Sequence, residues 1–178
     1  MWWRQALIIA TLTFAAVIVQ VTLLSRLGIP GATPDLVVVT VVAIALAMGP
    51  MPGATAGFLA GAFVDISPPS DTPLGVNSIV YLIVGFITGF VVDPRDRTVL
   101  VSMGLVALST SGAALATAII DSVLGSSRVI WGEVPAVVVT SALYGLILAP
   151  IVLPSVAWLA GKLLPAPPPE MTLPPRIT

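Results

Sequence analysis

The sequence predicts an all-α integral membrane protein with about six transmembrane helices, folded as a single domain over residues 1–164. Only 8% of its residues are charged, whereas soluble domains contain about 25%, and its mean hydropathy is +1.10. Crossing a bilayer as a helix takes about 20 apolar residues. Four stretches contain no Asp, Glu, Lys or Arg and meet that length: residues 5–25, 72–92, 98–120 and 134–161.

The first helix is expected over residues 5–25, directly after Trp2, Trp3 and Arg4. Its apolar run is longer than the roughly 7–15 residues found in the core of a signal peptide. We therefore interpret it as a retained helix whose two preceding tryptophans lie at the membrane interface.

The segment between Asp35 and Asp65 contains 29 uncharged residues and is interrupted by Gly49-Pro50-Met51-Pro52-Gly53, which is typical of a turn. The flanking helices, expected over 36–48 and 54–66, are short. A helix of 13 residues extends only about 20 Å, and the bilayer core is about 30 Å thick. Two tilted spans, a re-entrant hairpin and one broken span all fit. We favour two spans, because a break at mid-membrane would leave backbone groups without partners.

The remaining spans are expected over residues 73–92, 98–124 and 134–162, and the two prolines of the last one, Pro150 and Pro154, are expected to bend it. Residues 165–178 are rich in proline and are expected to form a disordered cytoplasmic tail.

Basic residues concentrate on the cytoplasmic side of membrane proteins. A cytoplasmic N-terminus with six spans places five of the seven basic residues inside: Arg4, Arg95, Arg97, Lys162 and Arg176. A single broken span with an external N-terminus gives the same split, so charge alone does not decide between them. Every arrangement places the 65–71 loop outside and the C-terminus in the cytoplasm. We expect the N-terminus to be cytoplasmic as well.

Four glycines occur in pairs with a spacing of four residues: Gly57 and Gly61, then Gly85 and Gly89. Small residues at this spacing give a helix a flat face on which another helix can pack closely. The sequence leaves open whether that second helix belongs to this chain or to a partner.

The carboxylates fall into two classes. Asp35 follows Pro34 at an expected helix start, where a side-chain oxygen caps free N–H groups. Asp65 instead lies at the C-terminal end of an expected helix, where negative charge is unfavourable. It therefore either makes a structural contact or belongs to a partner or ligand site. Asp121 lies near the same membrane surface, and Arg128 is a candidate ion-pair partner of either Asp121 or Asp65.

The residue inventory excludes several kinds of chemistry. The chain has no Cys and no His, which rules out thiolate nucleophiles, imidazole bases and the common zinc and haem ligands. It contains neither a Gly-x-Ser-x-Gly elbow nor a phosphate-binding loop, and its net charge of −1 gives no basis for nucleic-acid binding. We expect no catalytic residue, no metal site and no cofactor.

One ordered set of motifs resembles a known family. Pro34-Asp35-Leu36 opens an apolar segment, and a Gly49-Pro50 break follows it. Next come Gly57-Phe58-x-x-Gly61-x-x-x-Asp65, a short Pro/Ser loop and Pro73-Leu74-Gly75. Over residues 34–90 this order resembles the bacterial rod shape-determining protein MreD family.

The resemblance implies a non-catalytic subunit of the machinery that elongates the bacterial side wall, located in the cytoplasmic (inner) membrane. Such a subunit works with MreC, with the glycosyltransferase RodA, with a class B penicillin-binding protein and with the actin-like MreB. On this basis we expect the single membrane helix of MreC to pack on Gly57, Gly61, Gly85 and Gly89. We expect contacts at the outer face from four further residues: Asp65, Pro73, Leu74 and Gly75.

The resemblance also implies a fold similar to the substrate-binding subunits of energy-coupling-factor vitamin transporters, which supplies an alternative function. A solute-binding subunit would have an external pocket covered by the 26–34 or 66–73 loop. We would expect polar side chains such as Asn77, Ser78 and Asp121 to line it. A few converging polar groups in an apolar cleft are typical of such sites, and aromatic and polar groups are few in this chain.

Overall fold

The computed structural model describes residues 2–22, 34–67, 73–91, 98–125 and 129–163. Within these ranges the chain is all-helical, with six helices and no strand, as predicted. Their bounds are α1 Trp2–Thr22, α2 Leu36–Met48, α3 Pro50–Ile66, α4 Val76–Val91, α5 Val99–Val123 and α6 Val134–Leu163. Three of them, α1, α5 and α6, are long and apolar enough to cross a membrane, which is consistent with a membrane protein.

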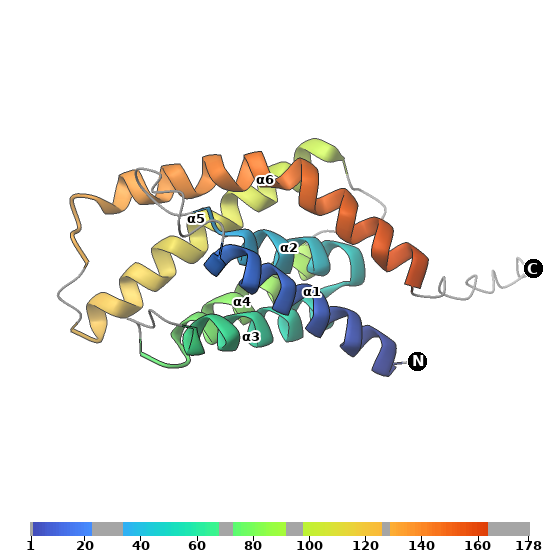
Figure 1. The fold of residues 1–178 in the computed structure, drawn as a ribbon. Helices are drawn as coiled ribbons and strands as arrows, with labels where there is room; N and C mark the ends of the chain where they lie inside the picture. Colours follow the sequence, from blue (N-terminus) through green and yellow to red (C-terminus); the bar gives the residue numbers. More distant parts are fainter. Residues whose placement is uncertain (1, 23–33, 68–72, 92–97, 126–128, 164–178) are drawn as a thin grey trace, which may run out of the picture.

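Successive helices run in opposite directions (Figure 1). The start of α1, the turn between α2 and α3 and the end of α6 lie at one end of the bundle. We call the opposite end the distal end. It is defined by the residues at which helices begin or end there: Thr22, Leu36, Ile66, Val76, Val123 and Val134.

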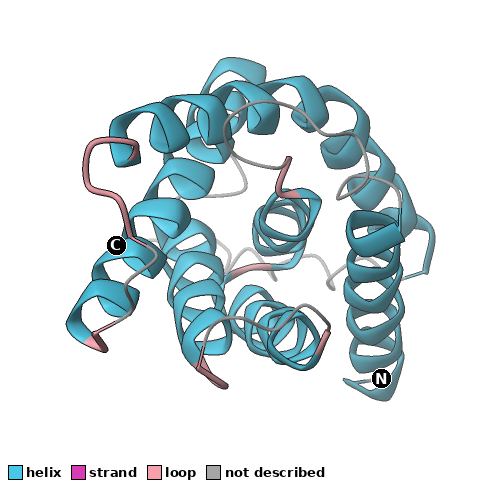
Figure 2. Ribbon diagram, turned by 60° about the vertical axis from the view of Figure 1, so that its left-hand side comes forward, coloured by secondary structure: helices cyan, strands magenta, loops and turns pink. Residues whose placement is uncertain are grey.

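Helix α2 lies in the middle of the bundle and contacts each of the other five helices. Figure 2 shows one helix enclosed by a ring of others. Ten consecutive residues of α2, Val37 to Leu46, are buried. A helix that is apolar on every side is expected in such a position. Its one hydroxyl, on Thr40, donates to the Leu36 carbonyl at 2.8 Å and is therefore paired within the helix.

The predicted break lies at Gly49, whose φ of 96° is a conformation that favours glycine. The chain reverses there, since a Cβ at Gly53 would lie 2.6 Å from the Ala45 Cβ on the preceding helix. The reversal excludes one broken span that continues in a single direction. The predicted start of the next helix at residue 54 was wrong. Helix α3 begins at Pro50, because proline is well tolerated in the first turn of a helix.

The paired glycines bring α3 and α4 into backbone contact. A Cβ at Gly57 would lie 2.0 Å from the Tyr81 carbonyl oxygen, and one at Gly61 would lie 2.4 Å from the Ser78 Cα. A Cβ at Gly85 or Gly89 would meet the backbone of α3 in the same way, at 2.2 Å from Gly53 and 2.6 Å from Pro50.

This in-chain contact corrects the expectation that a partner's helix packs on the glycines. Helix α4 already occupies the face formed by Gly57 and Gly61, and α3 occupies the face formed by Gly85 and Gly89. The small residues are therefore used to join two helices of the same chain, the alternative that the spacing had left open.

The last helix, α6, carries Pro150 and Pro154 in its interior, and Figure 1 shows it bending along its second half, as predicted. It packs on α5 through Gly145, where a Cβ would lie 2.8 Å from the Thr110 hydroxyl oxygen. Residues 23–25 and 92 of the expected spans, and the expected tail over 165–178, lie outside the described residues.

A single methyl group tests the contact between α3 and α4. Gly57→Ala should destabilise the fold by about 1–3 kcal/mol, because the new Cβ overlaps backbone atoms that cannot move independently. The change in stability is measured as a shift in the midpoint of thermal unfolding in detergent, with size-exclusion chromatography as the readout of folded protein. Gly104→Ala on α5 is the control, since nothing lies within 4 Å of a Cβ there. Equal unfolding midpoints for the two variants would contradict the packing described.

Candidate functional site

Asp65 is the centre of a buried polar cluster at the distal end. It lies in the last turn of α3 and is only 2% exposed. Its carboxylate accepts from the backbone N–H groups of Gly75 at 2.9 Å, Asn77 at 3.3 Å and Ser78 at 3.2 Å. The Asn77 amide and the Ser78 hydroxyl donate to it as well, at 2.9 and 2.8 Å.

These five hydrogen bonds explain a charge at an unfavourable position. The first N–H groups of a helix have no partner inside that helix, and its N-terminal end carries a partial positive charge. Asp65 is at the C-terminal end of α3, but its carboxylate reaches the N-terminal end of α4. The interaction with α4 thus offsets both the burial of the charge and its position on α3.

The cluster corrects the expected role of Asp65 as an external contact, because a carboxylate that is buried and satisfied by five donors is not presented to a partner. Gly75, with φ of 98°, makes the turn that brings its N–H to Asp65. Pro73 and Leu74 remain exposed, Leu74 to 77%. These two side chains are therefore the part of the expected outer contact that the fold leaves accessible.

Asp35 caps α2, as predicted. Its Oδ1 accepts from the Val38 N–H at 3.0 Å. Its Oδ2 accepts from the Tyr81 hydroxyl at 3.1 Å, which joins the start of α2 to α4. Gln20 adds α1 to this group, because its side-chain oxygen accepts from the Val37 N–H at 2.9 Å.

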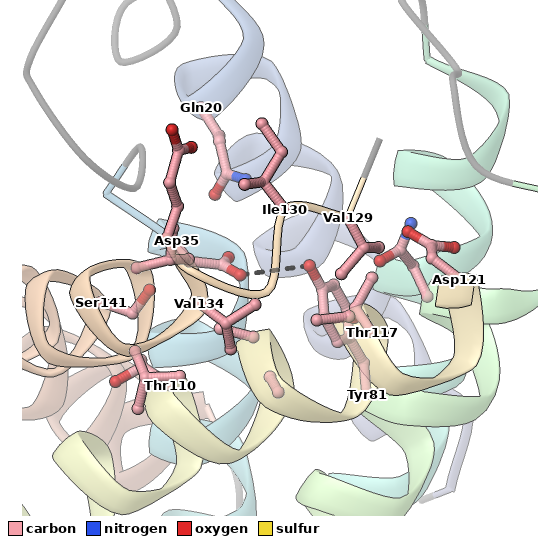
Figure 3. A pocket seen from close by; sticks show the side chains of 17 residues that line it. Gln20, Asp35, Tyr81, Thr110, Thr117, Asp121, Val129, Ile130, Val134 and Ser141 are labelled. Atoms are coloured by element: carbon pink, nitrogen blue, oxygen red, sulfur yellow. Dashed lines mark hydrogen bonds between the residues drawn. The ribbon is translucent and has the colours of Figure 1, made fainter. Parts of the chain in front are cut away.

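A cavity of about 430 Å³ opens beside Asp35 at the distal end, between α5, α6 and the ends of α1, α2 and α4 (Figure 3). Helices α5 and α6 pack together at Gly145 and lie apart toward this end (Figure 1). Charged and amide side chains line the cavity: Gln20, Asp35, Asn77, Asp121 and Glu133. Hydroxyl groups on its wall come from Tyr81, Thr110, Thr117 and Ser141.

The cavity matches the expected external pocket in part. Asn77 and Asp121 line it, but Ser78 does not, because its hydroxyl donates to Asp65. Most of the loops expected to cover the pocket lie outside the described residues, as does Arg128, the candidate partner of Asp121 or Asp65. Local sequence reasoning missed Tyr81 and Gln20, since nothing in the sequence indicates that either lies beside Asp35.

The carboxylate cluster gives a direct stability prediction. Asp65→Asn keeps the size of the side chain but replaces one acceptor with an NH₂ group facing backbone N–H donors. It should lower the free energy of unfolding by at least about 2 kcal/mol, because buried donors lose a charged acceptor. Asp35→Asn is the control, since asparagine is also a good N-cap. The free energy of unfolding of both variants is measured in mixed detergent micelles. A loss of stability for Asp65→Asn that is equal to or smaller than that for Asp35→Asn would contradict this role of Asp65.

No family model, no curated protein and no solved structure matches this chain.

Proposed function

We propose that the chain is a non-catalytic membrane scaffold of the bacterial cell-wall elongation machinery. All six helices would cross the cytoplasmic membrane, with both termini in the cytoplasm and the distal end outside. MreC would be the direct partner. RodA, a class B penicillin-binding protein and MreB would be joined directly or through MreC.

One observation carries the proposal: the residues that make up the motif converge on a single structural unit. Gly57 and Gly61 hold α3 against α4, and Asp65 accepts from the N–H of Gly75 across the turn. These residues are spread over two helices and an intervening loop, yet each depends on the others for its contact. A connected unit of this kind supports a resemblance in fold rather than in hydropathy alone.

The helix order supports the proposed topology. Neighbouring helices alternate in direction, and both ends of the described chain lie at the end opposite Asp65 (Figure 1). Helices α2, α3 and α4 have 13, 17 and 16 residues. Helices of this length reach about 20–25 Å, which suits tilted spans.

The proposed contact with MreC lies at the exposed turn before α4. Asp65 and Gly75 fix the backbone of this turn, and Leu74 projects from it with 77% of its surface exposed. A rigid turn that presents an apolar side chain can bind a partner at a low entropic cost. In the proposed topology this turn faces the external part of MreC.

A second function is favoured by the cavity. A volume of about 430 Å³ lined by several polar groups is within the range of small-molecule sites. It supports a solute-binding subunit of an energy-coupling-factor transporter as the alternative.

Affinity purification from the native cells in mild detergent, with mass spectrometry of the co-purified proteins, separates the two functions. Recovery of MreC together with RodA or a penicillin-binding protein is the expected result. Recovery of paired ATPases with a coupling membrane subunit would contradict the scaffold function and support the transporter.

A charge at the exposed turn tests the placement of the interface. Leu74→Glu should reduce the recovery of MreC by about tenfold or more, because a glutamate at an apolar contact has to be desolvated on binding. Leu100→Glu is the matched control. Leu100 is 82% exposed and lies at the start of α5, at the other end of the bundle. Equal recovery with both variants, at equal protein levels, would exclude the turn as the interface.

A further inference from the structure

We propose that the cavity at the distal end binds a small organic cation that carries a hydrogen-bonding group. This goes beyond the scaffold function and does not depend on it, since the site is formed entirely within this chain.

Fixed negative charge is the first property that selects the ligand. The Asp35 and Glu133 carboxylates both line the cavity, and no Lys or Arg is among the described residues that do so. Asp35 is held in place by the Val38 N–H and the Tyr81 hydroxyl, and the Gln20 side chain and the Val37 N–H also hydrogen-bond to it. A nearby cation is attracted by the charge of this carboxylate and needs no free acceptor position on it. Tyr81 also lines the cavity, and aromatic rings attract ammonium groups.

An unused hydroxyl is the second property. Ser141 is 5% exposed and lines the cavity (Figure 3), yet its hydroxyl has no hydrogen-bond partner within the described part of the chain. Neighbouring hydroxyls behave differently. Thr140 donates to the Ala136 carbonyl at 2.8 Å, and Thr110 donates to the Val106 carbonyl at 3.0 Å. Buried polar groups are normally paired, so Ser141 is available to a ligand.

The volume limits the size of that ligand. A cavity of about 430 Å³ corresponds to a small molecule rather than to a lipid tail or a peptide. Alanines at positions 113, 114 and 118 form part of the α5 wall, and their short side chains keep the space open. A compact cation with a hydroxyl or a ring substituent fits these limits.

Ligand-observed saturation-transfer NMR on the full chain in phosphatidylglycerol nanodiscs tests the charge selectivity. This lipid has no ammonium group that could compete. The probes are choline, benzyltrimethylammonium and 3,3-dimethyl-1-butanol, the neutral isostere of choline. At millimolar concentration we expect transfer to at least one cation and none to the neutral alcohol. Equal transfer to choline and its isostere, or no transfer to either cation, would overturn the proposal.

Variants then assign the binding to this cavity. The double variant Asp35→Asn with Glu133→Gln should weaken cation binding by roughly tenfold or more, as expected when charged hydrogen-bond partners are removed. Ala114→Leu should abolish binding by filling the cavity. Gly104→Leu on the same helix is the control, because a side chain there meets open space. Unchanged binding in the double variant, with normal unfolding midpoints, would place the cation elsewhere and overturn the assignment.

Discussion

The buried carboxylate of Asp65 is the interaction on which the rest of the bundle depends. Removing a charge from water is costly unless it is fully paired, and here five donors surround it, one from Gly75 just before α4 and four from Asn77 and Ser78 in its first turn. The charge therefore fixes where α4 begins and how it is placed against α3. Gly57 and Gly61 continue the contact between α3 and α4 along both helices, because they allow the two backbones to touch. Neither feature suffices alone, because close packing sets the distance between the helices and the carboxylate sets their register.

The remaining helices are arranged around this pair and the central α2. Polar contacts at the distal end join α1, α2 and α4 through Gln20, Asp35 and Tyr81. At the opposite end the core is entirely apolar along α2, where a chain reversal at Gly49 needs no side-chain partner. Helices α5 and α6 contact each other at Gly145 and are apart at the distal end. The polar cavity lies in the space between them, next to the cap of α2.

Features that depend on local sequence could be predicted, and those that depend on contacts between distant residues could not. The helical class, the break at Gly49, the cap at Asp35 and the bend in α6 each follow from residues within a few positions. The role of Asp65 could not be predicted in this way, because its donors are 10 to 13 positions away. Nothing in the local sequence shows that the intervening loop brings them back to Asp65. The spacing of Gly57 and Gly61 indicated a packing face, but the sequence carried no information on which helix covers it. Asn77 and Asp121 were predicted as pocket residues, whereas nothing near Tyr81 in the sequence indicates that it lies in the pocket beside Asp35.

Hydrogen–deuterium exchange in nanodiscs tests the central claim most directly, through the amides at the start of α4. First-turn amides usually exchange rapidly, because they have no partner within the helix. We predict slow exchange at Gly75, Asn77 and Ser78, whose N–H groups donate to Asp65. Val99 and Leu100, in the exposed first turn of α5, should exchange fast in the same sample. Equally fast exchange at both helix starts would contradict the account, because it would show that the Asp65 carboxylate does not hold α4.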